Sequence, residues 1–124
     1  MKTFFGTNIF LRYLTKDDPS KYEKCKDICR KALEGKVTLA TSGIVVAELI
    51  WTLLSYYRVP KADVIELISI IVRTENLYIP DKDIITDALV LYSRKNIDYI
   101  DAYNAVCMKC QGLNEIILMT RILM

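Results

Sequence analysis

Short apolar runs alternate with helically spaced apolar positions from one end of the chain to the other. The runs at residues 3–5, 37–40, 77–80 and 116–118 are typical of strands. The segments between them carry apolar residues every three or four positions, which predicts helices over residues 9–14, 20–34, 43–57, 61–74, 83–94 and 98–111. Strands separated by helices indicate an α/β fold, with a short parallel sheet of about four strands flanked by helices on both faces.

Residues that favour helix ends stand at the boundaries of these segments. Thr41 or Ser42 precedes the helix that reaches residue 57, and Asp98 precedes the last helix, so these are predicted N-caps. The other boundary residues are Asp17, Asp18, Pro19, Asp81 and Asp83 at helix starts, Pro60 after a helix, and Gly35 and Gly112 at helix ends. No linker or repeat interrupts the pattern, so we predict one domain over residues 1–124.

Composition narrows the chemistry. Hydrophobic residues make up 52% of the chain and charged residues 26%, which excludes a disordered tail. The net charge is only +2, so charge alone does not indicate a nucleic-acid partner. The chain has no histidine, so catalysis must use carboxylates, thiols, lysines or a metal held by oxygen. The N-terminus does not resemble a signal peptide, and no apolar run reaches the roughly 18 residues of a membrane span. We therefore expect a soluble, cytoplasmic protein.

The four cysteines suggest two interpretations. Cys25 and Cys29 with Cys107 and Cys110 are a possible four-thiolate zinc site. However, Cys25 and Cys29 fall on an apolar helical stripe, and neither pair lies in a glycine-containing turn. We therefore predict that the cysteines are core residues.

Three acidic residues are candidates for chemistry. Glu48 shares a predicted helix side with Val45 and Thr52, and the same helix is expected to bury Ile44 and Leu49. A carboxylate on an apolar face is costly unless it is paired, hydrogen-bonded or bound to a metal. Its structural interpretation is a boundary residue that reaches solvent or a partner such as Arg12.

Asp98 and Asp101 lie within one helical turn. They could simply cap and stabilise the helix N-terminus. The functional interpretation places one or both in a cleft with Glu48, as oxygen ligands for Mg²⁺ or Mn²⁺.

Three segments, residues 5–19 (FGTNIFLRYLTKDDP), 42–51 (SGIVVAELIW) and 98–105 (DYIDAYNA), resemble PIN-domain ribonucleases of the VapC toxin type in order and spacing. The resemblance covers nearly the whole chain. It implies a small parallel sheet with flanking helices, and an acidic pocket in which Mg²⁺ or Mn²⁺ activates water against an RNA phosphodiester. It also implies a VapB-like antitoxin that blocks the pocket, and a homodimer.

The resemblance assigns roles to individual positions. Glu48 matches the second acid of the family, Asp101 the third, and Asp98 an auxiliary acid. Metal and catalytic roles are therefore expected for these three residues. The supporting positions are Thr7 and Asn8 after the first acid, Ser42 beside the pocket, and Arg12, which could support the site or meet the RNA backbone.

Two departures from the family pattern predict an impaired or inactive enzyme. Gly6 stands where the family carries its first acid, and Thr120 stands in the region where the family carries a fourth-acid motif, Thr-x-Asp. If the coding sequence after Ile117 is read one base earlier, permitted codons for residues 118–124 can give Thr-His-Asp-Lys-Asp-Phe-Asp. One interpretation is therefore a frameshift that removed this motif and truncated the domain. The other is a naturally divergent chain whose last strand is residues 116–119.

Two functions from different classes follow. The first is a metal-dependent endoribonuclease of the toxin type, weakened by the missing acids. The second is a catalytically dead module of the same fold that binds an antitoxin or RNA. A phosphoacceptor receiver domain fits the length but lacks the acidic pair that is expected after the first strand.

Overall fold

The computed structural model describes residues 2–15, 19–112, 116–117 and 122–123. Its first half contains β1 (Lys2–Phe4), α1 (Thr7–Thr15), α2 (Pro19–Leu33), β2 (Thr38–Ala40) and α3 (Gly43–Ser55). Its second half contains α4 (Lys61–Val72), β3 (Leu77–Tyr78), α5 (Lys82–Arg94), α6 (Tyr99–Cys110), β4 (Ile116–Ile117) and β5 (Ile122–Leu123). The predicted α/β class is confirmed.

The main sheet is parallel and has the strand order β1-β2-β3. Phe4 is paired with Ala40, and Ala40 is paired with Tyr78. Among the described residues this sheet therefore has three strands, where about four were predicted. The predicted last strand, of which Ile116 and Ile117 are described, pairs antiparallel with β5 in a separate two-stranded unit.

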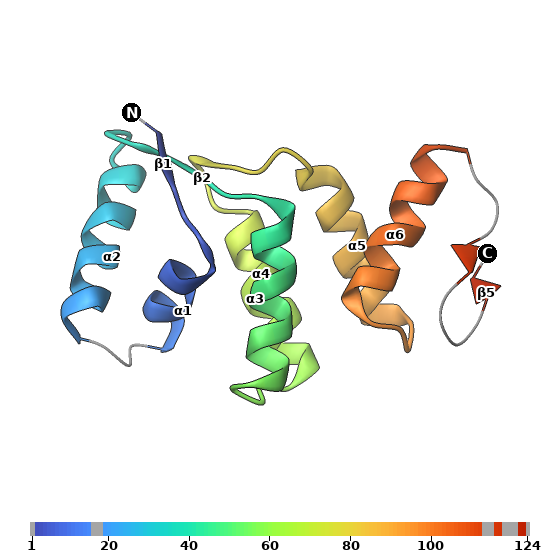
Figure 1. Ribbon diagram of the computed structural model, residues 1–124. Helices are drawn as coiled ribbons and strands as arrows, with labels where there is room; N and C mark the ends of the chain where they lie inside the picture. The colour runs from blue at the N-terminus through green and yellow to red at the C-terminus, as the bar shows by residue number, and fades with distance from the viewer. Residues whose placement is uncertain (1, 16–18, 113–115, 118–121, 124) are drawn as a thin grey trace.

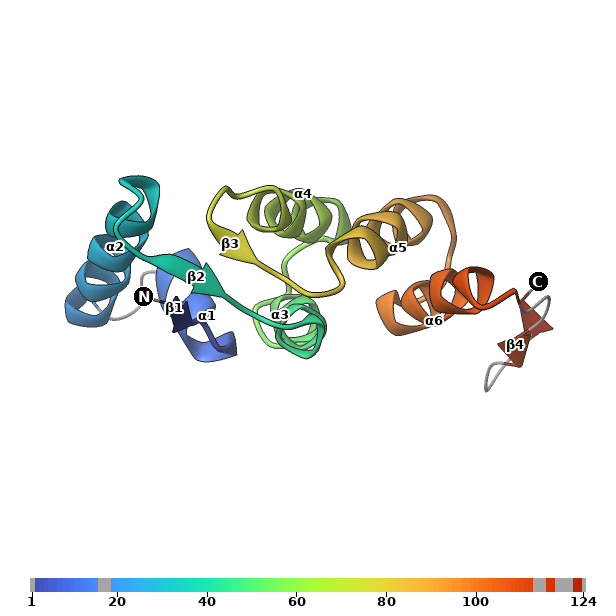
Figure 2. The same cartoon turned by 90° about the horizontal axis from the view of Figure 1, so that it is seen from above.

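The helices flank this sheet and pack on one another in sequence (Figure 1). Helix α1 contacts α2 and α3, α3 contacts α4 and α6, and α5 packs along α6. Seen from above, α2 lies at one end of an elongated molecule, and α6 with β4 lies at the other (Figure 2). The strands that carry the carboxyl-terminal edge of the sheet are therefore far from the outer side of the α5–α6 pair.

Most predicted helix ends are confirmed. Ser42 caps α3 by accepting a hydrogen bond from the backbone N–H of Val45 at 3.2 Å. Gly35 and Gly112 follow α2 and α6 with φ of +77° and +74°, a left-handed conformation that favours glycine. Asp81, one of the two residues predicted to cap α5, occupies its N-cap position, but its side chain makes no capping hydrogen bond.

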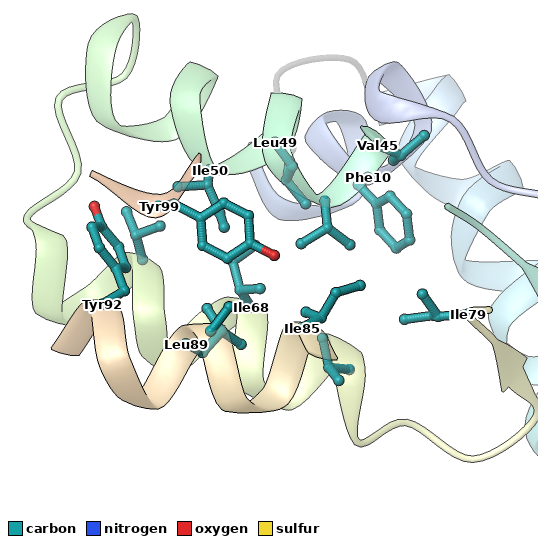
Figure 3. Close-up of a cluster of buried hydrophobic side chains, with 14 of the residues drawn as sticks. Phe10, Val45, Leu49, Ile50, Ile68, Ile79, Ile85, Leu89, Tyr92 and Tyr99 are labelled. Carbon is teal, nitrogen blue, oxygen red and sulfur yellow. The ribbon is translucent and has the colours of Figure 1, made fainter. Parts of the chain in front are cut away.

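The hydrophobic core lies between α3, α4, α5 and the start of α6 (Figure 3). The face of α3 that enters it carries Val45, Val46, Leu49, Ile50 and Leu53. The prediction that Ile44 belongs to this face is wrong, since its side chain is 74% exposed. Successive helical residues are about 100° apart, so Ile44 and Glu48 share the opposite face.

The cysteines are not all core residues. Cys25 is buried, Cys29 and Cys107 are half-buried, and Cys110 is exposed. The prediction is therefore confirmed for Cys25 and wrong for Cys110, which lies at the end of α6 beyond the packed part of the helix. Among the helices of the described segments, none combines the length and apolar character needed to cross a membrane.

Candidate functional site

The carboxyl ends of the three parallel strands meet at one edge of the sheet, where ligands bind in open α/β folds. The backbone N–H of Phe5 donates to the carbonyl of Ala40 at 2.7 Å and extends the pairing to the last residue before Gly6. Thr41, only 3% exposed, donates its hydroxyl to the carbonyl of Phe5 at 2.8 Å. Gly6 and Ser42 therefore lie at this edge, just after the neighbouring strands β1 and β2.

Gly6 connects β1 to α1. Its φ is not in the left-handed region, and a Cβ at this position would meet nothing within 4 Å. Neither backbone strain nor crowding therefore requires glycine here. The two polar residues that follow begin α1: Thr7 is half-buried and Asn8 is exposed. Arg12 lies one turn further on and is half-buried.

Ser42 and Gly43 begin α3 beside the carboxylate of Asp81, which the sequence pattern predicts only as a helix cap. A Cβ at Gly43 would lie 3.7 Å from Oδ2 of Asp81. The same oxygen accepts a hydrogen bond from the Tyr103 hydroxyl of α6 at 2.9 Å. Asp81 therefore places its negative charge near the N-terminus of α3, where the helix dipole favours it, and its hydrogen bond connects the start of α5 to α6.

Position in the fold could have identified Asp81. It comes two residues after Ile79, at the carboxyl end of β3, which is the same edge of the sheet as Gly6 and Ser42. The tyrosine partner could not be read from the sequence, because Tyr103 lies 22 residues away on another helix.

Two tyrosines of α6 adjoin this region. Burial and the hydrogen bond to Asp81 raise the pKa of Tyr103. Burial, and then the neighbouring Tyr103 and Cys107, raise the pKa of Tyr99. Figure 3 shows the Tyr99 ring among the buried side chains, and its hydroxyl has no hydrogen-bond partner among the described residues.

The two acids at the start of α6 have a structural function. Asp98 is exposed and caps the helix, because its Oδ1 accepts the backbone N–H of Asp101 at 2.8 Å. Asp101 is half-buried in the first turn, where the helix dipole favours a negative charge. The capping interpretation of Asp98 is therefore confirmed, and capping leaves its second oxygen available.

Glu48 occupies the outer face of α3. It is exposed, and in the described segments it makes no hydrogen bond or ion pair, so the alternative of a salt bridge to Arg12 is wrong. Trp51, 67% exposed, and Ile44 lie on the same face. The expectation of a carboxylate on a buried apolar face is also wrong, because Glu48, Ile44 and Trp51 are all exposed.

The three candidate acids do not come together as one metal site in this arrangement. Across the described segments, no three His, Cys, Asp or Glu side chains come together in a group that could hold a metal. Mg²⁺ prefers a near-octahedral shell of oxygens and is usually held through one or two carboxylates. Glu48, Asp98 and Asp101 are present but not gathered, Gly6 supplies no donor side chain, and Thr120 lies outside the described residues.

Comparison with known families agrees with this architecture. The model of the PIN domain matches residues 4–121. The chain therefore belongs to the PIN domain family, which has a nuclease-type fold, acts on RNA and generally uses Mg²⁺ or Mn²⁺. No curated protein matches the chain.

Proposed function

We propose that this chain derives from metal-dependent endoribonucleases of the VapC toxin type, which hydrolyse RNA phosphodiesters, and that it is itself impaired or inactive. Its membership of the PIN family supports the nuclease origin. The open position at Gly6 supports the impairment, because the first acid of the family is replaced there by a residue without a side chain.

Gly6 is the main support for the proposed impairment, because nothing in the fold requires glycine at this position. A glycine needed for a left-handed turn or a close approach would be explained by folding alone. Here the position has room for a side chain and stands at the edge of the sheet where α/β folds bind ligands. The loss of the carboxylate therefore alters the chemistry of the site and leaves the fold intact.

The remaining acids define what the chain can still do. We propose that Glu48, Asp101 and Asp98 are the residual catalytic acids, supported by Thr7, Asn8, Ser42 and Arg12. Their separation and the missing donors weaken binding of Mg²⁺ or Mn²⁺. Without the ion, these carboxylates would repel an RNA phosphate, because both groups are negative.

The toxin origin implies partners. We propose that a VapB-like antitoxin binds the chain, that the chain forms a homodimer, and that it acts in the cytoplasm. The exposed apolar residues Ile44 and Trp51 beside Glu48 support a contact surface on α3.

The alternative is a catalytically dead module that keeps the fold and binds an antitoxin or RNA. A substitution of the exposed Glu48 can distinguish the two functions, because it should not disturb the core. Glu48→Ala would lower residual cleavage if the chain is a weak enzyme. It would leave every measurable activity unchanged, with partner binding retained, if the chain is a binding module.

The test is Mn²⁺-dependent cleavage of a mixed RNA substrate by three proteins. They are the chain as it stands, a restored version with Gly6→Asp and Thr-His-Asp-Lys-Asp-Phe-Asp after Ile117, and the restored version with Gly6→Asn. Asparagine fills the same space as aspartate without its charge. We expect cleavage at least 100-fold faster by the restored version than by the other two. Equal cleavage by the chain and the restored version would refute the proposed impairment.

A further inference from the structure

A groove of about 430 Å³ runs between α5 and α6, on a part of the molecule that the proposed nuclease site does not use. Its floor is aliphatic and comes from both helices, with Val90 and Leu91 on α5 and Val106 and Met108 on α6. Val90 is 44% exposed, so the floor is open to a ligand. An open apolar groove of this kind is typical of a binding surface.

The rim of the groove is mainly basic. Arg94, Lys95 and Lys109 line it, and Asp87 is the one acidic residue among the lining residues. Within the described segments, none of the three basic side chains makes an ion pair. The three positive charges of the rim would attract negatively charged groups of a ligand, and the aliphatic floor would contact its apolar groups.

The lining distinguishes a protein segment from RNA. Proteins that bind single-stranded RNA stack its bases on aromatic rings or on the planar guanidinium of arginine. The ten lining residues include no aromatic ring, and Arg94 supplies the one guanidinium. Aliphatic side chains and the adaptable Met108 suit leucine-like side chains better than bases. The floor therefore favours a peptide.

The charge of the rim also disfavours a dimer in which the grooves of two copies of this chain face each other. A two-fold interface brings the same surface patch of both subunits together. Pairing this groove with itself would bring two net positive rims face to face, and like charges oppose association. An acidic segment of a different protein meets no such repulsion.

We infer that the α5–α6 groove binds an acidic, amphipathic segment of a partner protein, with leucine-like side chains on Val90 and Met108 and carboxylates against Arg94 and Lys109. Helical segments that lay an apolar face into a groove are a common mode of recognition. This surface is independent of Glu48 and of the carboxyl edge of the sheet, so it does not depend on the proposed ribonuclease activity.

The test is fluorescence anisotropy with a labelled helical peptide that carries leucines at i, i+3, i+4 and i+7 and glutamates on its flanks. A second peptide replaces the glutamates with lysines. We expect the acidic peptide to bind at least tenfold more tightly than the basic one, and its affinity to fall as salt is raised. No binding of the acidic peptide, or equal binding of both, would overturn the inference.

Variants locate the binding on the protein. Arg94→Glu with Lys109→Glu should weaken binding at least tenfold, and Val90→Glu should weaken it similarly by placing a charge on the apolar floor. Lys24→Glu with Lys26→Glu makes the same change of net charge at exposed positions of α2 and should leave affinity within twofold. Circular dichroism confirms that each variant is folded.

Two results would overturn the inference even if the peptide binds. One is that the double rim variant binds as tightly as the control with Lys24→Glu and Lys26→Glu. The other is that an unlabelled single-stranded RNA binds the same groove more tightly than the peptide and depends on the same rim residues, which would make the surface an RNA site.

Discussion

The two faces of α3 differ in burial, so their residues contribute to the protein in different ways. On the inner face, Leu49 and Ile50 are almost completely buried in the core. On the outer face, Glu48 lies between exposed Ile44 and Trp51 and makes no contact that folding requires. Burial in the core explains the inner face, whereas the residues of the outer face are exposed and are the ones that we propose form a contact surface. Substitutions on the two faces should therefore separate stability from function.

The largest expected effect on stability is at the inner face. Leu49→Ala removes a buried side chain and leaves a cavity, so it should lower the free energy of unfolding by about 2–5 kcal/mol. Urea denaturation followed by circular dichroism measures this change. Glu48→Ala is the matched control on the next residue, and a comparable loss for both variants would contradict the assignment of the two faces.

The edge of the sheet should give the next largest effect. Thr41→Val keeps the shape of a buried side chain but removes the hydroxyl that donates to the carbonyl of Phe5. The unsatisfied carbonyl should cost about 1–3 kcal/mol. Ser55→Val, at an exposed position near the end of α3, is a suitable control and should change stability by less than about 0.5 kcal/mol.

The hydrogen bond between α6 and the start of α5 should contribute less, because Tyr103 is only half-buried. Tyr103→Phe removes the donor to Asp81 and should cost about 1 kcal/mol. In Asp81→Ala, which removes the acceptor, Tyr103→Phe should have a much smaller effect. Additive losses in this double-mutant cycle would show that the hydrogen bond does not couple the helices.

Stability should also fall at high pH. Burial raises the pKa of Tyr99 and Tyr103 above the ordinary value of 10.0, so both stay protonated in the folded protein when they ionise in the unfolded chain. Their contribution is therefore complete below about pH 10 and is lost as pH rises above it. Denaturation at pH 8 and pH 11 measures the loss, which should be smaller in Tyr99→Phe. A loss unchanged by Tyr99→Phe, and equal to that in Tyr56→Phe at an exposed position, would contradict this account.

The smallest expected effect on stability is at Glu48 itself. Glu48→Gln removes the charge from an exposed side chain and should change the free energy of unfolding by less than about 0.5 kcal/mol. A loss above 2 kcal/mol would show that Glu48 has a structural partner.

Much of the fold could be predicted from periodicity. The order of strands and helices, the Ser42 cap and the glycine ends of α2 and α6 follow from local rules. The fourth strand could not be placed in this way, because short apolar runs do not say which strand they will pair with. Ile116 and Ile117 are a strand, as predicted, but their partner is β5.

The candidate site was harder to predict because it depends on tertiary contacts. Helical spacing places Ile44 and Glu48 on one face, but it does not say whether that face is covered. Asp81 has the sequence pattern of an N-cap, yet its carboxylate accepts from Tyr103 of another helix. Asp98 behaves as the pattern predicts, because its hydrogen bond is made within its own helical turn.

Binding of Mn²⁺ tests the central claim most directly, because it does not require the natural RNA. Mn²⁺ would be titrated into the chain, into Gly6→Asp and into Gly6→Asn, and electron paramagnetic resonance would measure how much Mn²⁺ each protein binds. The proposed loss of the first acid predicts binding at least tenfold tighter in Gly6→Asp than in the other two proteins. Equal affinity in all three, with each variant folded, would contradict the claim that the missing carboxylate at position 6 impairs the site.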